Sequence, residues 1–330
     1  VRTLGEPGVA GADFGRLHHP DGLTVDGQES LFIADTGNHR IQVFSPDGAY
    51  LTTIGGNRGD GTGGLVEPGA VAVAPDGRVL VADTYNHRVQ AFALAGDRWR
   101  PEAVNGFGAR DTAAVEALAE LGGRLYAGVR AASGAAILRR DGDGPWETAV
   151  AGGLGDVANQ AVVALSAHGG RLYAGVENLT GTVDPATGLS TEASAGGALW
   201  RSADGARWDV VASGGLGVSD QSAIGPFASF DGQLYAGTRS IDRATPPQLW
   251  RSPSGDAGSW QRVRIELATV REWPKNGGVS SMTVYSGSLY VGTCAADQAQ
   301  VWRSTDGSVW RATAQLEPGG DPRDALAQLG

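Results

Sequence analysis

Short stretches in which apolar and polar residues alternate run through the chain, and Gly, Asn and Asp separate them. Residues 31–44 read Leu-Phe-Ile-Ala-Asp-Thr-Gly-Asn-His-Arg-Ile-Gln-Val-Phe, and residues 79–92 repeat that stretch almost unchanged. Alternation with a period of two on both sides of a turn predicts a β-hairpin. Because Asp35 returns as Asp83, 48 residues later, one supersecondary unit has been copied and packs against its neighbours.

The first repeat family covers roughly residues 4–106 and contains two copies. Asp47-Gly48 and Asp76-Gly77 predict tight turns within them, since glycine tolerates a positive φ. Each copy therefore predicts four antiparallel strands. These lie at residues 23–26, 31–35, 41–45 and 50–54, and again at residues 70–74, 79–83, 89–94 and 98–104.

A second repeat family fills the rest of the chain, and its mark is the pair Leu-Tyr between glycines. A further apolar strand and a tight turn that ends in Trp follow at residues 199–208, 249–260 and 301–310. Two insertions, at residues 178–196 and 267–277, lengthen the later copies. The four tyrosines, 47, 62 and 55 residues apart, are Tyr126, Tyr173, Tyr235 and Tyr290.

Two copies plus four copies predict an all-β fold, a single six-bladed β-propeller of four-stranded antiparallel blades. We expect residues 1–15 to supply a closing strand and loop and residues 316–330 to form a C-terminal tail. Residues 310–314 already predict a fourth strand for the last sheet, so either residues 1–6 add a fifth strand to it or the chain was cut from something longer. The predicted blades are residues 16–56, 63–106, 110–152, 157–214, 219–268 and 276–315.

The composition of the chain argues against several classes of function. The net charge is −10 and Lys275 is the only lysine, so the chain has no basic patch for nucleic acid. No stretch approaches about 18 uninterrupted apolar residues, which argues against membrane insertion. The single cysteine, Cys294, cannot form an intramolecular disulfide, and we interpret it as a small buried strand residue. The scarcity of lysine beside abundant Ala, Gly and Arg is typical of a high-GC bacterial genome.

Two motifs carry family resemblances. Ala-Asp-Thr-x-Asn-His-Arg-φ-Gln-x-Phe, where φ is aliphatic, resembles NHL-repeat propellers over roughly residues 1–106. Trp-Arg-Ser-x-Asp-Gly-x-x-Trp looks like the Asp-box turn of sialidase-type (BNR) propellers over roughly residues 107–315, although it is one residue shorter. Both resemblances imply a propeller. Sialidases also need an arginine triad and an Arg-Ile-Pro motif near the N-terminus, and the motif does not occur, so we reject sialidase activity.

Several polar residues recur at fixed repeat positions, as metal ligands or catalytic carboxylates would. Each belongs to a package of turn formers, and side chains of this kind commonly hydrogen-bond the backbone of their own turn. We therefore interpret them as structural. These positions are Asp35, His39, Asp83, His87, Asp204 and Asp306.

Other polar residues lie where the first strand of a blade begins, next to the expected ring axis. One loop from each blade converges there, so these residues are candidates for a ligand site. A His, a Glu and a Gln around one axis are able to hold a divalent cation, Ca²⁺ or Zn²⁺, or a polar ligand; solvated loop residues are the competing interpretation. The candidates are His18, His19, Glu67, Gln160 and Ser222.

Three functions remain open. The first is a non-enzymatic binding propeller that recognises a protein or glycan through the axial mouth and the two insertions, with an extracellular or periplasmic location implied by the resemblance. The second is a metal-assisted lyase or hydrolase of the NHL type, for example lactonase-like, with its site near His19 and Glu67. The third is a structural subunit of a surface assembly. We expect no catalytic residue and no cofactor under the first hypothesis.

Overall fold

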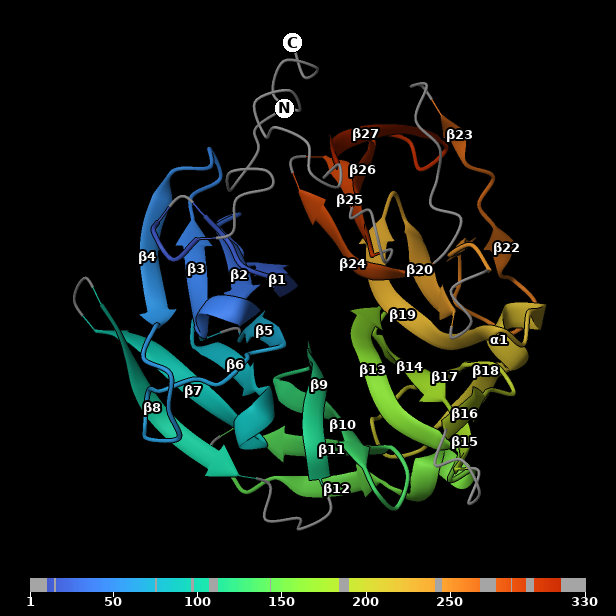
Figure 1. The fold of residues 1–330 in the computed structure, drawn as a ribbon, viewed down its shortest axis with the longest axis horizontal. Helices are drawn as coiled ribbons and strands as arrows, with labels where there is room; N and C mark the ends of the chain where they lie inside the picture. Colours follow the sequence, from blue (N-terminus) through green and yellow to red (C-terminus); the bar gives the residue numbers. More distant parts are fainter. Residues whose placement is uncertain are drawn as a thin grey trace.

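The fold consists of antiparallel strands arranged around a common centre (Figure 1). It is seen in a computed structural model. The residues that the structure describes are 11–14, 16–74, 76–95, 98–106, 112–142, 144–183, 190–240, 245–267, 277–285, 287–294 and 300–315. The predicted closing strand at residues 1–6 and the predicted tail at residues 316–330 lie outside them.

The two copies of the first repeat each form a separate four-stranded antiparallel sheet, as the alternation predicts. The first sheet contains β1 (Pro20–Val25), β2 (Leu31–Asp35), β3 (Arg40–Phe44) and β4 (Tyr50–Gly55). The second contains β5 (Ala70–Val73), β6 (Val79–Asp83), β7 (Arg88–Ala95) and β8 (Arg98–Gly106). Short 3-10 turns, η1 (Thr36–Asn38) and η2 (Thr84–Asn86), join the second and third strands.

The second repeat also forms groups of four antiparallel strands, each paired in chain order. One group is β9 (Thr112–Leu121), β10 (Arg124–Ala131), β11 (Ala136–Asp141) and β12 (Glu147–Val150). The next is β13 (Asn159–His168), β14 (Arg171–Asn178), β17 (Ala198–Ser202) and β18 (Asp209–Ala212). Single-turn segments, η3 (Gly152–Gly155) and α1 (Gly214–Gly217), lead out of these two groups.

Two more groups complete the described chain. They are β19 (Gln221–Phe230), β20 (Gln233–Ser240), β21 (Leu249–Ser252) and β22 (Gln261–Arg262), and then β24 (Gly278–Tyr285), β25 (Ser288–Cys294), β26 (Gln300–Ser304) and β27 (Val309–Gln315). A two-residue strand, β23 (Glu266–Leu267), pairs in parallel with β27. Single-residue bridges join β10 to β13, β14 to β19 and β20 to β24, so strand pairing runs on continuously from β9 to β27.

The first strands of the groups form the inner wall. β1 contacts β5, β5 contacts β9, β9 contacts β13, β13 contacts β19, β19 contacts β24, and β24 contacts β1. Of the two insertions, residues 178–196 contain a separate hairpin of β15 (Thr180–Val183) and β16 (Ser190–Ala193). Most of the second insertion lies outside the described residues. No helix among the described residues is long and apolar enough to cross a membrane.

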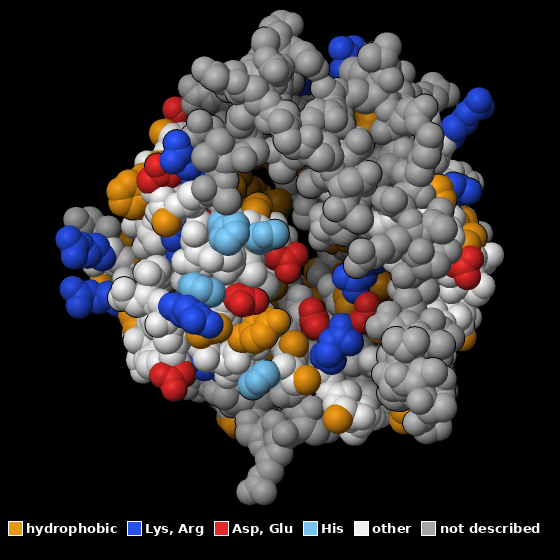
Figure 2. Space-filling view, in the orientation of Figure 1, with side chains coloured by type: hydrophobic (Ala, Val, Ile, Leu, Met, Phe, Trp, Pro, Cys, Tyr) orange, Lys and Arg blue, Asp and Glu red, His pale blue; other side chains and the backbone are white. Residues whose placement is uncertain are grey.

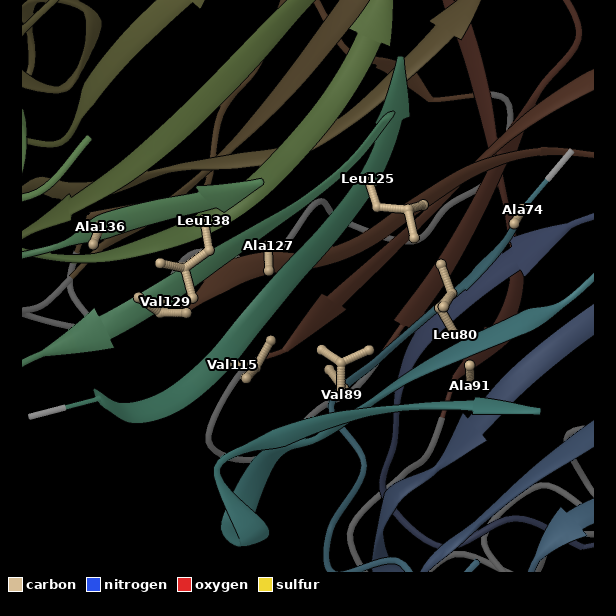
Figure 3. Close-up of a cluster of buried hydrophobic side chains, with 11 residues drawn as sticks. Ala74, Leu80, Val89, Ala91, Val115, Leu125, Ala127, Val129, Ala136 and Leu138 are labelled. Atoms are coloured by element: carbon tan, nitrogen blue, oxygen red, sulfur yellow. The ribbon is translucent and has the colours of Figure 1, made fainter. Parts of the chain in front are cut away.

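The hydrophobic core is divided among the boundaries between neighbouring groups, which we call seams. Figure 3 shows the cluster at the seam between the β5–β8 and β9–β12 groups, where Leu80 and Val89 meet Val115 and Leu125. Similar clusters fill the next seams in each direction along the chain. Burial of apolar surface stabilises a fold by about 25 cal/mol per Å², so these clusters are the main force that holds the groups together.

The Leu-Tyr motif of the second repeat has a packing role. The hydroxyl of Tyr173 donates a hydrogen bond to the carbonyl oxygen of Ser254, in the Trp-Arg-Ser turn of the next group, at 3.2 Å. Tyr126 reaches Asp204 in the same way at 3.5 Å. A Cβ on the turn glycine of the next group, Gly205 or Gly255, would overlap the tyrosine ring, so the turn needs glycine there.

Candidate functional site at the axial mouth

The recurring aspartate of the first repeat anchors a corner of its own sheet. Asp35 is fully buried and accepts hydrogen bonds from the backbone N–H of His18 at 2.6 Å and from the side chains of Asn38 (2.9 Å), Arg40 (2.7 Å) and Gln42 (3.2 Å). The carboxylate thereby ties the entry to β1 to the turn after β2.

Asp83 repeats this arrangement in the second copy. It is also fully buried, and it accepts from the backbone N–H of Val66 at 2.7 Å and from Asn86, Arg88 and Gln90 at 2.7–3.0 Å. The matching donors show that His18 and Val66 occupy the same repeat position. At this position the first copy has a histidine and the second has a valine.

The recurring histidines close the corner turns. His39 and His87 both have a left-handed backbone, with φ of 57° and 52°. The Nδ1 atom of His39 accepts a hydrogen bond from the backbone N–H of Glu67 at 3.1 Å, which links the first sheet to the second. His87 is exposed.

The aspartates of the Trp-Arg-Ser turns cap their own turns. The Asp204 carboxylate accepts from the backbone N–H groups of Arg207 (2.9 Å) and Ala206 (2.8 Å), and these bonds lower the pKa of Asp204 to about 2. Backbone N–H groups of Ser308 and Val309 lower the pKa of Asp306 in the same way.

His19 and Glu67 share a conformation as well as a repeat position. Their φ angles are 48° and 47°, a left-handed backbone that is uncommon outside glycine. His19 is exposed, and its ring centre lies 4.7 Å from that of half-buried His18. Among the described residues, no group of three or more His, Cys, Asp or Glu side chains is arranged to hold a metal ion.

The side chains of the other two predicted mouth residues donate hydrogen bonds to backbone carbonyl groups. Gln160 is the second residue of β13 and donates from Nε2 to the carbonyl oxygen of Leu179 at 3.0 Å. Ser222 is the second residue of β19, is buried, and donates to the carbonyl oxygen of Arg239 at 3.3 Å. Both side chains therefore connect the start of a first strand with the region where the second strand ends.

A network of charged side chains, which the sequence analysis missed, lies at these same strand ends. The carboxylate of Glu177, at the end of β14, contacts Arg130 of β10 at 2.6 Å and Arg239 of β20 at 2.5 Å. Arg130 also contacts Glu116 of β9 at 3.0 Å. The three neighbouring groups are thus joined by ion pairs. We call Asp21, Glu116, Arg130, Glu177 and Arg239 the axial charge cluster.

The repeat contains the signal that locates three members of this cluster. Arg130, Glu177 and Arg239 each stand four residues after the tyrosine of the Leu-Tyr motif, and Cys294 occupies that position in the last copy. The charge at this repeat position changes from positive to negative and back to positive along the three copies, so each side chain can form an ion pair with its neighbour. A comparison of that position across copies would have predicted the ion pairs.

Burial and opposing charges act on Glu177 together. Removal from water would raise the pKa of this carboxyl, but the positive charge of Arg239 and the hydrogen bond from Arg130 outweigh it and hold the pKa below its ordinary value. The carboxylate is therefore ionised at neutral pH and carries the shared negative charge between the two arginines.

Asp21 of β1 has the least favourable electrostatic surroundings in the axial charge cluster. The side chain is exposed to solvent, but protein atoms surround it and remove part of its hydration. This desolvation raises the pKa of Asp21, and the negative charge of Glu116 raises the pKa further. The positive charge of Arg239 acts in the opposite direction and lowers the pKa. Figure 2 shows acidic, basic and histidine side chains around a hollow at the centre of one face. A positively charged ligand group would relieve the repulsion between the two carboxylates.

The inserted hairpin begins beside this cluster. Asn178 follows Glu177 directly, and its amide is held by the buried Asn159 at 3.0 Å. The far end of the insertion returns to the same residue, since Ser194 donates to the Asn178 carbonyl oxygen at 2.6 Å. Strands β15 and β16 therefore leave and rejoin the fold at the rim of the axial mouth.

The first repeat matches a known protein family. The family model described as "NHL repeat" matches residues 17–44 and 65–92. The chain contains two NHL repeats. They coincide with the β1–β3 and β5–β7 regions, so the Asp35 and Asp83 corners lie within them. The Asp-box resemblance of residues 107–315 stays a prediction.

No curated protein matches the chain, but solved structures share its fold. A streptogramin B lyase is 10% identical with a TM-score of 0.61 and covers 92% of this chain and 84% of its own. The virginiamycin B lyase from Staphylococcus aureus is 12% identical, with a TM-score of 0.59 and coverages of 92% and 85%. The RRP9 WD40 repeats are 16% identical, with a TM-score of 0.56 and coverages of 92% and 83%. At these identities the likeness shows the β-propeller-like fold alone.

Proposed function

We propose that the chain is a single six-bladed β-propeller that binds a protein partner at its axial mouth and catalyses no reaction. Six groups of four strands and the closed order of contacts from β1 through β24 back to β1 support the blade count. A ring of this kind gathers one loop per blade at the mouth, which suits recognition. An extracellular or periplasmic location remains part of the proposal.

The observation that carries the proposal is the incomplete pairing of the axial charge cluster. Glu177 is satisfied by two arginines, but Asp21 faces Glu116 as a like charge at a solvent-exposed position. Like charges brought close together favour an added opposite charge. We therefore propose that the mouth takes a lysine or arginine side chain of the partner, while the β15–β16 hairpin contacts the partner beside it.

A peptide-display selection tests this function. With the full chain as bait, the enriched peptides should carry Lys or Arg, and their affinity should fall at least about tenfold for Asp21→Asn/Glu116→Gln, a loss of about 1.4 kcal/mol or more. Affinity should also rise with pH as Asp21 ionises, because the ionised carboxylate attracts the cation.

Asp231→Asn is the matched control. Asp231 is exposed in the turn between β19 and β20, at the end of the strands opposite the mouth, so Asp231→Asn removes one carboxylate charge, half the charge removed by the double substitution, without touching the cluster. Peptides without Lys or Arg, or equal loss of affinity in the control, would overturn the proposed binding mode.

The metal-assisted lyase or hydrolase is the second candidate, and the adjacent rings of His18 and His19 favour it. Its test is titration of Zn²⁺ and Ca²⁺ into the protein and into His19→Ala/Glu67→Ala. Stoichiometric binding that the double substitution abolishes, with the circular dichroism spectrum unchanged, would favour the enzyme over the binding propeller.

A further inference from the structure

Tyr85 places an aromatic ring at the axial mouth. It lies in η2, and its side chain is 64% exposed. The backbone N–H of Tyr85 donates to the carbonyl oxygen of Val66, just before β5, at 3.2 Å. The hydroxyl of Thr84 donates to the carbonyl oxygen of Val115, on β9, at 3.1 Å. The tyrosine is therefore held between the entry to β5 and the strand β9.

Acidic side chains share this part of the mouth. The next residue on each of the two segments that hold the tyrosine is a half-buried glutamate, Glu67 or Glu116. The Oδ2 atom of Asp21 lies 3.9 Å from the position of a Cβ on Gly69, and the backbone N–H of Gly69 donates to the Thr84 hydroxyl at 3.1 Å. Figure 2 shows apolar surface between acidic side chains at the edge of the central hollow. The aromatic ring and the carboxylates thus lie on one arc of the rim.

The first NHL repeat forms the same corner without an aromatic ring. Gly37 occupies the position of Tyr85 there. Asp35 is nevertheless buried among the same kinds of donor as Asp83. A Cβ on Gly37 would clash with the ring of His18, so an imidazole fills this space in the first copy. The fold of the corner therefore does not require the Tyr85 ring, and a ligand has access to its exposed surface.

Arginine suits this arrangement better than lysine. Its guanidinium is planar, so one face can stack on an aromatic ring while the N–H groups at its edge donate to carboxylates. The ammonium of lysine is a compact, strongly hydrated charge with no face to stack. The axial charge cluster contains three carboxylates and two guanidinium groups, so one added cation balances its charge.

We infer that the mouth selects arginine over lysine and that Tyr85 is the residue responsible. The arginine stacks on the Tyr85 ring, and its N–H groups donate to the carboxylates of Asp21 and Glu116. This inference rests on the proposed function, because it names which of the two cations the same site takes. It adds Tyr85, which is not part of the axial charge cluster, to the binding surface.

Matched peptides test the inference. The arginine peptide with the highest affinity from the display selection is compared, by isothermal titration calorimetry, with the same peptide carrying Lys in place of Arg. The arginine version should bind the unaltered protein at least about threefold more tightly. Tyr85→Ala should weaken binding of the arginine version about two- to fivefold and bring the two affinities to within about twofold of each other.

Further variants complete the comparison. Tyr85→Phe keeps the aromatic face, so it should keep the preference for arginine. Leu94→Ala is the control, since Leu94 is 57% exposed near the far end of β7, away from η2, and both affinities should stay unchanged. If the circular dichroism spectrum shows that Tyr85→Ala does not fold, Tyr85→Leu replaces it, because leucine fills space without an aromatic face.

The outcomes separate this inference from the proposed function. Enriched peptides that depend on Lys, equal binding of both versions, or a preference that Tyr85→Ala leaves intact would overturn the inference and leave the proposed function standing. Enrichment of peptides without Lys or Arg would overturn both.

Discussion

At the scale of the residue, two aspartates show how the surrounding groups decide the role of a charged side chain. Asp35 is buried with four donors around it, so its charge is balanced within one corner. Within the described parts of the chain Asp21 has no comparable set of donors, and its pKa is raised. The first residue therefore has a structural role, and the second is the one we propose for binding.

Replacement of Asp35 by Ala should be strongly destabilising. The substitution leaves Arg40, which is buried, without its carboxylate, and breaking a buried pair of this kind costs about 3–5 kcal/mol. Urea denaturation would measure the loss. Asp13→Ala, at an exposed ion pair with Arg16, should cost less than about 1 kcal/mol. Similar losses in both variants would show that the corner does not depend on its carboxylate.

Replacement of Asp21 by Asn should stabilise the protein at neutral pH. A carboxyl whose pKa is raised in the folded state destabilises the fold once it ionises, and this penalty is absent below its ordinary pKa of 3.8. The advantage of Asp21→Asn should therefore appear as the pH rises above 3.8 and persist at pH 7. Thermal unfolding across this range measures it; an advantage independent of pH would contradict the crowding of Asp21.

At the scale of the element, the tight turns of the second repeat add contacts between neighbouring groups to the apolar packing of the strands. The turn at Gly205 caps its own amides through Asp204 and receives Tyr126 from the preceding group. A single turn thus combines backbone geometry with contact between groups. This explains why the Trp-Arg-Ser-x-Asp-Gly pattern recurs although it lies far from the axial charge cluster.

Gly205→Ala should destabilise the protein by about 1–3 kcal/mol, because φ is +71° and the new Cβ would overlap the Tyr126 ring. Gly59→Ala is the control, since a Cβ there meets no atom within 4 Å. Chemical denaturation of both variants would measure the difference. A cost for Gly205→Ala no larger than that of the control would mean that the turn does not clamp the tyrosine.

At the scale of the whole molecule, two kinds of contact join the groups: apolar clusters at the seams and ion pairs at the mouth. Glu177 links three groups through Arg130 and Arg239. Stability is therefore expected to differ from one seam to another around the ring.

Glu177→Gln should lower the free energy of unfolding at pH 7 by about 1–3 kcal/mol. This is the usual range for hydrogen bonds to charged groups, reduced here because both arginines are partly exposed. The pKa of Glu177 is lowered in the fold, so its contribution is complete above the ordinary value of 4.5 and is lost as the pH falls through the folded pKa. The gap between the two proteins should close in acid. Thermal unfolding at pH 7 and at pH 3 measures it; an equal gap at both values would refute the ion-pair network.

The sequence by itself determined the strands, the four-stranded unit and the corner and turn residues. This information is local: alternation sets the strands, glycine and asparagine set the turns, and the copies near Asp35 and Asp83 confirm each other within about 50 residues. Pairing His19 with Glu67 also followed from one repeat, and their common left-handed backbone agrees with it.

Only the tertiary structure decided which strand ends meet. Asp21 and Arg239 are far apart in the chain and act on one another only because the groups curve around a centre. The axial register could not be counted from the sequence, since β-bulges interrupt the first strands, and a slip of one residue moves a side chain to the other face. Burial at equivalent repeat positions was likewise decided by the tertiary structure, since Leu31 is half-buried and Val79 is fully buried although both occupy the same place in the repeat.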